Sequence, residues 1–219
     1  MTEEACCEPG DCRISRLSIG AVLLAAGEGS RLGFRAKGAI EIAGEPLLLR
    51  GLRILSEVGV DEMAVVTGHY HSEVSPLMAQ AERLFDDDRL VEVTQPMADH
   101  AQADSLRLGV TSLSQEVDAV MVLPVDMPAL TRGDLVALIA AYKHADPRIE
   151  FVGPMVGTRP GNPVLFSRRI ASGIVKGEGD FGSGAWRHKR PDWLMEWQPD
   201  NFHYLADIDT PEDLDGWIQ

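Results

Sequence analysis

The sequence predicts an α/β fold with one domain built around a doubly wound, mostly parallel sheet. Two continuous apolar runs, Ile19 to Leu24 and Ala119 to Leu123, lack the polar alternation of half-exposed strands and are typical of strands buried on both faces. Segments with helical spacing alternate with strand-like runs along the chain, which indicates parallel strands joined by crossover helices. The length of 219 residues suits a single domain with a substantial core.

The remaining elements follow in order. Pro46 to Val58 carries apolar residues at helical spacing and begins with a proline, which favours the first turn of a helix. Thr131 is the expected N-cap of a later helix, with Asp134 three residues beyond it, and Thr210 is the expected cap of a short helix opened by Pro211. Further strands are expected at 62–67, 90–93, 150–156 and 163–166, and further helices at 71–84, 102–113 and 132–144.

Residues 1–16 are expected to form a flexible tail ahead of a domain covering 17–219. The tail holds all three cysteines, Cys6, Cys7 and Cys12, at a spacing that is not standard for zinc and with no histidine nearby. Terminal segments without a periodic apolar pattern are commonly disordered. A redox or metal-delivery role for the cysteines stays open as an alternative.

Composition narrows the classes of function. An apolar content of 45% and a charged content of 25% are those of an ordinary soluble protein. The net charge of −14 argues against a nucleic-acid partner. No apolar run approaches the length of a membrane span, and the acidic N-terminus does not resemble a signal sequence, so we expect no membrane partner and a cytoplasmic location.

A glycine-rich turn after the first strand is the strongest chemical signal. In VLLAAGEGSRLGFRAK (22–37), glycines permit close approach of backbone N–H groups to phosphate oxygens, and exposed cations can neutralise the charge. The G-x-G-x-x-x-G spacing fits neither the dinucleotide fingerprint nor a Walker A loop. An ordinary surface turn is the alternative. The nucleotide-binding candidates are Leu24, Ala25, Ala26, Gly27, Gly29, Ser30, Arg31 and Lys37.

A carboxylate follows the second buried run. Asp126 stands in Pro124-Val125-Asp126-Met127-Pro128, directly after the strand predicted at 119–123. Open α/β sheets bind ligands at the carboxyl ends of their strands, so Asp126 is expected to face the glycine-rich turn. The sequence therefore predicts a magnesium ligand beside a triphosphate site, with Arg31, Lys37 and Asp126 as the catalytic residues.

These pieces together resemble the nucleotidyltransferases that attach a nucleotide to molybdopterin-type cofactors, and most closely the molybdenum cofactor cytidylyltransferase branch. The matching segments are LLAAGEGSRLG (23–33) with Lys37, EPLL (45–48), VTG (66–68), PVDMPAL (124–130), GNPVLFSRR (161–169) and DIDTPEDL (207–214). They occur in the family's order over nearly all of the chain after about residue 18. The resemblance implies a Rossmann-like fold of the nucleotide-diphospho-sugar transferase type.

The resemblance also implies further site residues. Thr67 joins the nucleotide-binding set, and Asp207 or Asp209 is implied as a second metal ligand, although acidic residues before a helix are also favoured as caps and by the helix dipole. Gly161, Asn162 and Pro163 are implied to contact the acceptor; a simple strand connector is the alternative. Asp180 lies in a glycine-rich segment that is implied to cover the acceptor, or else is a linker before a helix.

One segment departs from the family. Where cytidylyltransferases carry a Gly-Met-Ser-Ser-Ser-Leu type of segment, this chain has Ala101-Gln102-Ala103-Asp104-Ser105-Leu106. Loss of the glycine restricts backbone approach to a ligand. Asp104 is therefore expected either to read a sugar hydroxyl or a base amine, or to mark a different path of the loop.

The resulting hypothesis is an Mg²⁺-dependent transfer of a nucleotide to the phosphate of a molybdopterin-type cofactor, with pyrophosphate released. LAAG at 24–27 resembles the cytidylyl rather than the guanylyl branch, which implies CTP over GTP, and the resemblance also implies a client molybdenum hydroxylase. Two alternatives are transfer to another small phosphate (sugar phosphate, methylerythritol phosphate or phospholactate) and a non-catalytic cofactor carrier or insertion chaperone.

Overall fold

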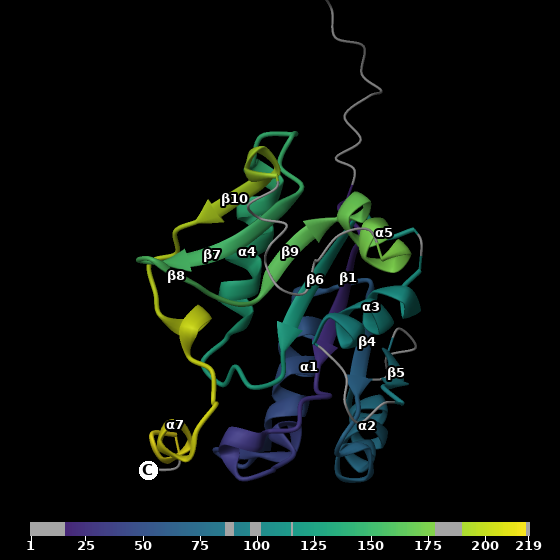
Figure 1. Cartoon of the computed structure of the whole chain (residues 1–219), viewed down its shortest axis with the longest axis vertical. Coiled ribbons are helices and arrows are strands. Elements are labelled where there is room, and N and C mark those ends of the chain that lie inside the picture. The colour runs from purple at the N-terminus through teal and green to yellow at the C-terminus, as the bar shows by residue number, and fades with distance from the viewer. Residues whose placement is uncertain (1–15, 86–89, 97–101, 115, 178–189, 218–219) are drawn as a thin grey trace, which may run out of the picture.

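An open sheet of eight strands forms the centre of the molecule (Figure 1). The computed structural model describes residues 16–85, 90–96, 102–114, 116–177 and 190–217, so the cysteine tail and Asp180 lie outside the described residues. The main path of the sheet has the order β10-β7-β9-β6-β1-β4-β5, and β8 pairs with β7. Its strands are β1 (Ile19–Leu24), β4 (Glu62–Thr67), β5 (Leu90–Thr94), β6 (Ala119–Pro124), β7 (Phe151–Val156), β8 (Arg159–Pro160), β9 (Val164–Ser167) and β10 (Leu194–Trp197).

The strand directions confirm the predicted, mostly parallel sheet. β1 lies between β4 and β6 and runs parallel to both, with Leu24 opposite Val66 on one side and Pro124 on the other. β9 is antiparallel to its neighbours β6 and β7. The carboxyl ends of β1, β4 and β6 therefore open at one edge of the sheet, as the sequence predicts.

Helices cover both faces of the sheet, which confirms the doubly wound arrangement (Figure 1). On one face, α1 (Leu47–Val58), α2 (His71–Phe85) and α4 (Arg132–His144) contribute to the larger apolar cluster. On the other face, α3 (Gln102–Ser112) and α5 (Arg168–Lys176) contribute to a second cluster. Every helix in the described ranges is too short or too polar to cross a bilayer.

Smaller elements complete the chain. α7 (Pro211–Asp215) follows the last strand, and β2 (Glu41–Ile42) and β3 (Glu45–Pro46) form a separate two-stranded sheet. The 3-10 helices are η1 (Ser30–Leu32), η2 (Lys37–Ala39), η3 (Pro191–Trp193) and η4 (His203–Leu205).

The predicted helix caps are present. Thr131 and Asp134 form a capping box at the start of α4, because the Thr131 side chain accepts from the Asp134 N–H and the Asp134 carboxylate accepts from the Thr131 N–H. Thr210 and Asp213 form a second capping box at the start of α7. These caps are local patterns, so the sequence alone predicts where both helices begin.

Among the elements that the sequence does not predict are the helix α5 and the strand β10. The helix α5 includes Ser172 and Gly173, both weak helix formers, and is stabilised instead by burial of Ile170, Ala171 and Ile174 on the sheet. The strand β10 has only four residues and pairs with β7 at the edge of the sheet. Tertiary contacts rather than local propensity account for both.

Candidate active site

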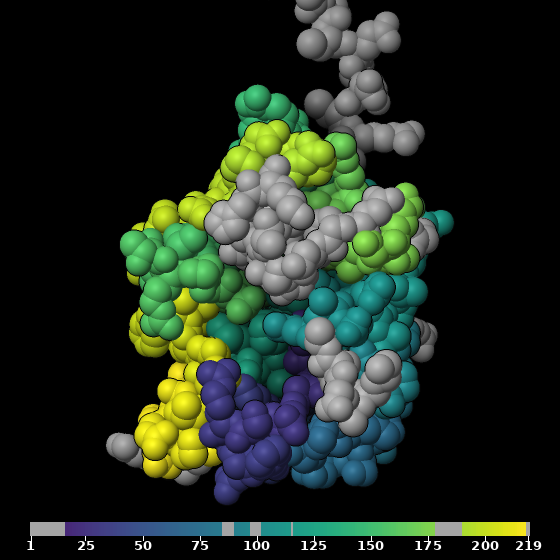
Figure 2. All heavy atoms as spheres, in the orientation of Figure 1, coloured from purple at the N-terminus to yellow at the C-terminus, as the bar shows by residue number. Residues whose placement is uncertain are grey.

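A pocket of about 380 Å³ opens at the carboxyl ends of β1 and β6. Most of the sequence-predicted nucleotide-binding residues come together in it. The space-filling view shows the purple N-terminal segment directly beside the yellow C-terminal segment on this side of the molecule (Figure 2). The pocket is lined by residues 24–31, Lys37, His69, Gln102, Ser105, residues 124–126 and Asp209.

The glycine-rich turn is held in place by backbone hydrogen bonds and by Tyr70, the residue before α2. The N–H of Ala25 donates to the Val66 carbonyl at 2.9 Å, which extends the β1–β4 pairing one residue into the turn. Gly29 has φ of 59°, and a Cβ there would lie 2.5 Å from the Arg35 carbonyl oxygen, so only glycine fits. The Tyr70 hydroxyl donates to the Glu28 carbonyl at 3.1 Å. These contacts define the path of the turn.

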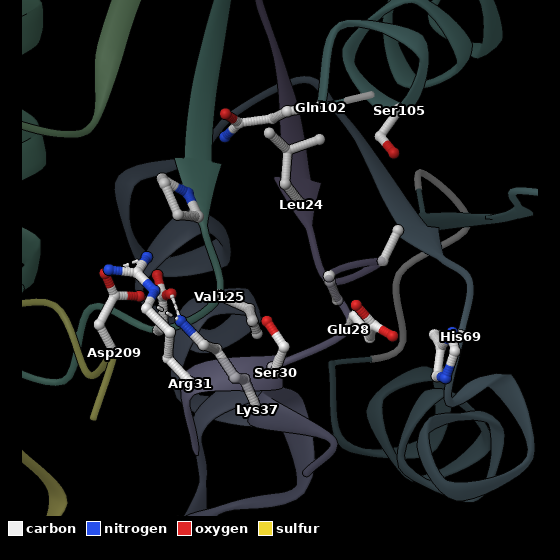
Figure 3. Close-up of a pocket in the computed structure, with 16 residues that line it drawn as sticks. Leu24, Glu28, Ser30, Arg31, Lys37, His69, Gln102, Ser105, Val125 and Asp209 are labelled. Atoms are coloured by element: carbon white, nitrogen blue, oxygen red, sulfur yellow. Dashed lines mark hydrogen bonds and ion pairs between the residues drawn. The ribbon is translucent and has the colours of Figure 1, made fainter. Parts of the chain in front are cut away.

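Two cations and two carboxylates converge at one side of the pocket (Figure 3). The Lys37 Nζ donates to Asp126 Oδ2 at 2.5 Å and to Asp209 Oδ1 at 2.7 Å. The Nη2 of Arg31 lies 2.7 Å from the other oxygen of Asp209. Arg31, Lys37, Asp126 and Asp209, predicted from separate motifs, thus form a single charge cluster.

Lys37 and Asp126 are largely shielded from water, and each alters the titration of the other. Their side chains are only 14% and 15% exposed. Burial lowers the pKa of Lys37, but attraction to Asp126 and Asp209 outweighs burial, so the pKa lies above the ordinary value of 10.5. Burial raises the pKa of Asp126; the Lys37 charge offsets part of that rise, and the negative charge of Asp207 adds to it.

Backbone contacts place the two carboxylates. The Val125 N–H donates to the Leu24 carbonyl at 3.0 Å, which ties the loop after β6 to the end of β1. The Ile208 N–H donates to the Asp126 carbonyl at 3.0 Å, and the Asp209 N–H donates to Asp213 Oδ2 at 3.0 Å. Asp209 is therefore held beside Asp126 although 83 positions separate them in the sequence.

The donor set fits a hard divalent cation bound together with a nucleotide. Mg²⁺ is usually bound by one or two carboxylates, with substrate phosphates and water supplying the other ligands. Asp126 and Asp209 present two adjacent carboxylates, whereas Asp207 is exposed. No group of three metal-ligating side chains occurs among the described residues, and in that part of the chain the site offers the two carboxylates of Asp126 and Asp209.

Six of the lining residues are not predicted from the sequence: Glu28, His69, Gln102, Ser105, Pro124 and Val125. Gln102 and Ser105 line the pocket from the first turns of α3 (Figure 3). Ser105 is 3% exposed, and within the described ranges its buried hydroxyl has no hydrogen-bond partner. Buried polar groups are normally paired, so this hydroxyl is available to a ligand. Helical spacing placed Ser105 on α3, but only the packing of α3 shows which side of the helix faces the pocket.

Two predicted nucleotide-binding residues are engaged elsewhere. The Asp104 carboxylate forms an ion pair with Arg107 at 2.7 Å and is not part of the pocket lining. Thr67 is fully buried, and its hydroxyl donates to Glu92 at 3.0 Å. Thr67 thus lies beneath the carboxyl end of β4, without reaching the pocket surface.

The predicted acceptor turn lies at the same edge of the sheet as Asp126. Its last residue precedes Val164 of β9, which pairs with Val122 near the end of β6. The Asn162 N–H donates to the Tyr204 carbonyl at 2.9 Å. A Cβ at Gly161 would lie 2.4 Å from that carbonyl oxygen, so the close approach requires glycine. The peptide bond between Asn162 and Pro163 is cis.

The family model described as the MobA-like NTP transferase domain matches residues 21–193. The chain belongs to this family. The match covers both the glycine-rich turn and Asp126, so the pocket lies within the shared domain. Family membership supports nucleotidyl transfer as the class of reaction.

Solved structures with the same fold extend over nearly the whole chain. Rv0371c from Mycobacterium tuberculosis H37Rv is 24% identical, covers 91% of this chain and 97% of its own, and has a TM-score of 0.73. A further structure of Rv0371c is a complex with manganese; it is 22% identical, covers 92% of this chain and 97% of its own, and has a TM-score of 0.66. The 4-diphosphocytidyl-2C-methyl-D-erythritol synthase from Anaerococcus prevotii is 15% identical, with 91% and 93% covered and a TM-score of 0.70. These likenesses show the nucleotide-diphospho-sugar transferase type of fold.

Curated relatives match over part of their length. The bifunctional protein GlmU of Azorhizobium caulinodans is 30% identical over 161 residues, which is 73% of this chain and 34% of GlmU. Two other matched relatives are covered over 12% and 25% of their length. The chain therefore spans between 12% and 34% of the length of these three bifunctional proteins.

Proposed function

We propose that the protein is a metal-dependent nucleotidyltransferase that moves CMP from CTP to the phosphate of a molybdopterin-type cofactor and releases pyrophosphate. The observation that carries the proposal is the cluster in which Lys37 bridges Asp126 and Asp209 beside the glycine-rich turn. Cations for phosphate and carboxylates for a metal are both needed where a triphosphate reacts. Membership of the MobA-like family supports the same class of reaction.

The turn and its cations would bind the triphosphate. Residues 25–31 line the pocket and supply backbone N–H groups of the kind that cradle phosphate oxygens. Arg31 and Lys37 would exchange part of their carboxylate contacts for phosphate oxygens. Asp126 and Asp209 would hold Mg²⁺, which when bound would neutralise developing charge at the α-phosphate.

The transfer itself requires little proton chemistry from the protein. An oxygen of the acceptor phosphate, already anionic, attacks the α-phosphorus of CTP and forms a P–O–P bond. The bond between the α-phosphorus and the bridging oxygen breaks, and pyrophosphate leaves with that electron pair. The chain's own residues therefore act by alignment and charge neutralisation, which account for most catalysis in such displacements.

The base would lie between the glycine-rich turn and the start of α3. Ala26 and Ser105 both line the pocket, and the Ser105 hydroxyl is free to hydrogen-bond a base or sugar. The LAAG sequence of the turn supports cytosine. The proposed product, a cytidylylated cofactor, would be passed to a molybdenum hydroxylase as its client.

A second candidate acceptor is suggested by one of the structures that share this fold. The methylerythritol synthase that shares this fold has a name indicating a diphosphocytidyl product, so a small sugar-alcohol phosphate is the second candidate acceptor. Sugar phosphate and phospholactate are related alternatives. A non-catalytic carrier that retains the nucleotide-binding fold is the alternative outside enzymes.

Pyrophosphate release separates these possibilities. The purified protein is incubated with Mg²⁺ and each of the four nucleoside triphosphates, with molybdopterin, with methylerythritol phosphate, or with no acceptor. The proposal predicts release that requires both CTP and molybdopterin. Release with another acceptor identifies that acceptor, and no release in any combination, from a protein that still binds nucleotide, supports the carrier.

A further inference from the structure

We infer that Asp134 and His203 form a clamp that positions the C-terminal strap, residues 201–209, over the active site. The strap carries Asp209 and contacts the acceptor turn, yet neither Asp134 nor His203 lines the pocket. In the ribbon view the yellow strap descends beside the sheet toward α7 (Figure 1). The kinetic part of this inference rests on the proposed function; the structural part does not.

The clamp consists of remote hydrogen bonds to one buried carboxylate. Asp134 is 5% exposed and sits in the first turn of α4. Its Oδ2 accepts from His203 Nδ1 at 2.9 Å, and its Oδ1 accepts from Asn201 Nδ2 at 2.9 Å. Burial favours the neutral carboxyl group, but the hydrogen bonds from Thr131, His203 and Asn201 outweigh burial and lower the pKa of Asp134. The carboxylate therefore accepts and the imidazole donates.

Helix capping does not account for the remote contacts. The capping box of α4 needs only Thr131, whose N–H and hydroxyl donate to Asp134 Oδ2 at 2.9 and 2.7 Å. The capping box of α7 shows the usual, local pattern. There the Asp213 carboxylate accepts from Thr210 and from the N–H of Asp209, both within four positions of it in the sequence. The partners of Asp134 at 201 and 203 are instead 67 and 69 positions away. They serve to fasten the strap to α4.

Tyr204 transmits this attachment to the acceptor turn. Its side chain is 1% exposed, and its hydroxyl donates to the Asp134 backbone carbonyl at 3.0 Å. Its ring packs edge-on against Trp197 at 5.4 Å. Its carbonyl accepts from the Asn162 N–H at 2.9 Å. The position of residue 162 therefore depends on where the strap is fastened.

The other end of the strap reaches the charge cluster. Ile208 donates its N–H to the Asp126 carbonyl at 3.0 Å, and Asp209 contacts Lys37 and Arg31. Only five residues separate His203 from Asp209, so the attachment of His203 to α4 helps to fix where the strap enters the charge cluster. The buried Tyr204 and Ile208 side chains and the hydrogen bond from Asp209 to Asp213 share this task. Asp134 and His203 are thus positioning residues, because they act through the strap and touch neither nucleotide nor acceptor.

Hydrogen exchange of the full-length protein tests the clamp without requiring activity. His203→Ala removes the donor to Asp134, whereas His203→Asn places an amide N–H near the position of Nδ1 and should rescue the contact. We expect amide exchange at Asn162 and Ile208 to become about tenfold faster in His203→Ala, since a hydrogen bond to a charged group is lost. Exchange in His203→Asn should stay close to that of the unmodified protein.

A second variant controls for general destabilisation. Asp61→Ala removes a carboxylate that accepts from the Ile19 N–H at 2.8 Å, at the opposite end of β1 from the pocket. It should lower Tm without changing exchange at Asn162 or Ile208. If His203→Ala lowers Tm but leaves both amides unchanged, or if Asp61→Ala accelerates them equally, the clamp is overturned.

Kinetics complete the test once an acceptor is known. His203→Ala should raise the Mg²⁺ concentration needed for half-maximal transfer and the acceptor KM, with His203→Asn restoring both. Unchanged metal and acceptor requirements in His203→Ala would overturn the positioning role. Absence of transfer by the unmodified protein with every acceptor would overturn the proposed function, while the exchange result would still decide the clamp.

Discussion

Lys37 lies between Asp126 and Asp209, and its ammonium group is their shared counter-ion. A lysine exposed on a surface turn would contribute little to stability. The Lys37 side chain is instead only 14% exposed, and it is the cation paired with Asp126 and one of two cations paired with Asp209. Lys37 therefore contributes to stability as well as to the proposed phosphate site.

Lys37→Ala should abolish nucleotide turnover and also lower the free energy of unfolding by about 1–3 kcal/mol, the usual cost of leaving a buried polar partner unpaired. The loss should be smaller near pH 3, because burial raises the pKa of Asp126, so this carboxyl group is protonated there and no longer needs a counter-ion. Denaturant unfolding at pH 3 and pH 7, beside a pyrophosphate assay, measures both effects. Normal turnover in the variant would show that Lys37 is purely structural.

Asp126→Asn keeps the shape of the side chain but removes the charge that would hold a metal. We expect turnover to fall by a factor of hundreds or more, since metal-based charge stabilisation is worth several kcal/mol. The fold should persist, because the neutral amide avoids part of the cost of burying a charge. Circular dichroism and a turnover assay test this together; near-normal activity in a folded variant would contradict the assignment.

At the scale of elements, the turn after β1 and the start of α3 together form the proposed base site. Ala26 is 3% exposed, and a glycine there would leave more room for a purine. The unmodified protein should prefer CTP to GTP, and Ala26→Gly should narrow the preference by roughly 10- to 200-fold, the range of a single steric contact. Competition between CTP and GTP for one acceptor measures this. A preference for GTP in the unmodified protein would refute the cytosine assignment.

The start of α4 should make stability depend on acid. The pKa of Asp134 in the folded protein lies below its ordinary value of 3.8, so the ionised carboxylate stabilises the folded state. This contribution is fully present above the pKa of the unfolded chain and is lost as the pH falls through the pKa of the folded protein. The free energy of unfolding should decrease between pH 5 and pH 2.5, and the decrease should be smaller in Asp134→Asn than in the unmodified protein. An identical slope in the two proteins would show that Asp134 does not contribute to the acid sensitivity.

At the scale of the whole molecule, the structured domain should function without residues 1–16. Their deletion also removes Arg16, which forms an ion pair with Asp61 at 2.9 Å. The Arg16 side chain is exposed, so this pair should contribute little to stability. Tm and nucleotide turnover should stay nearly unchanged. A large loss of activity on deletion, or stoichiometric metal bound through Cys6, Cys7 and Cys12, would show that the tail has a role of its own.

Features that depend on local pattern could be predicted from the amino-acid sequence. The pattern of apolar residues predicts β4 at 62–67 and α4 at 132–144, the bounds that are observed. Such predictions succeed because a buried strand or helix has a characteristic spacing of apolar residues within a few positions. Glycine spacing and the carboxylate after β6 indicated which residues line the pocket. The order of the motifs resembles the molybdenum cofactor nucleotidyltransferases, and the coarser MobA-like NTP transferase family is shown over residues 21–193.

Which of these residues are in contact depends on the packing of the fold and could not be predicted from the sequence. Asp104 pairs with Arg107 while Ser105, one position on, faces the pocket, because the packing of α3 on the sheet sets its rotation. Lys37 meets Asp209, and His203 meets Asp134, across 172 and 69 positions. No local sequence pattern predicts contacts between residues so far apart in the chain. These contacts form because the packing of the sheet and its helices brings remote segments together.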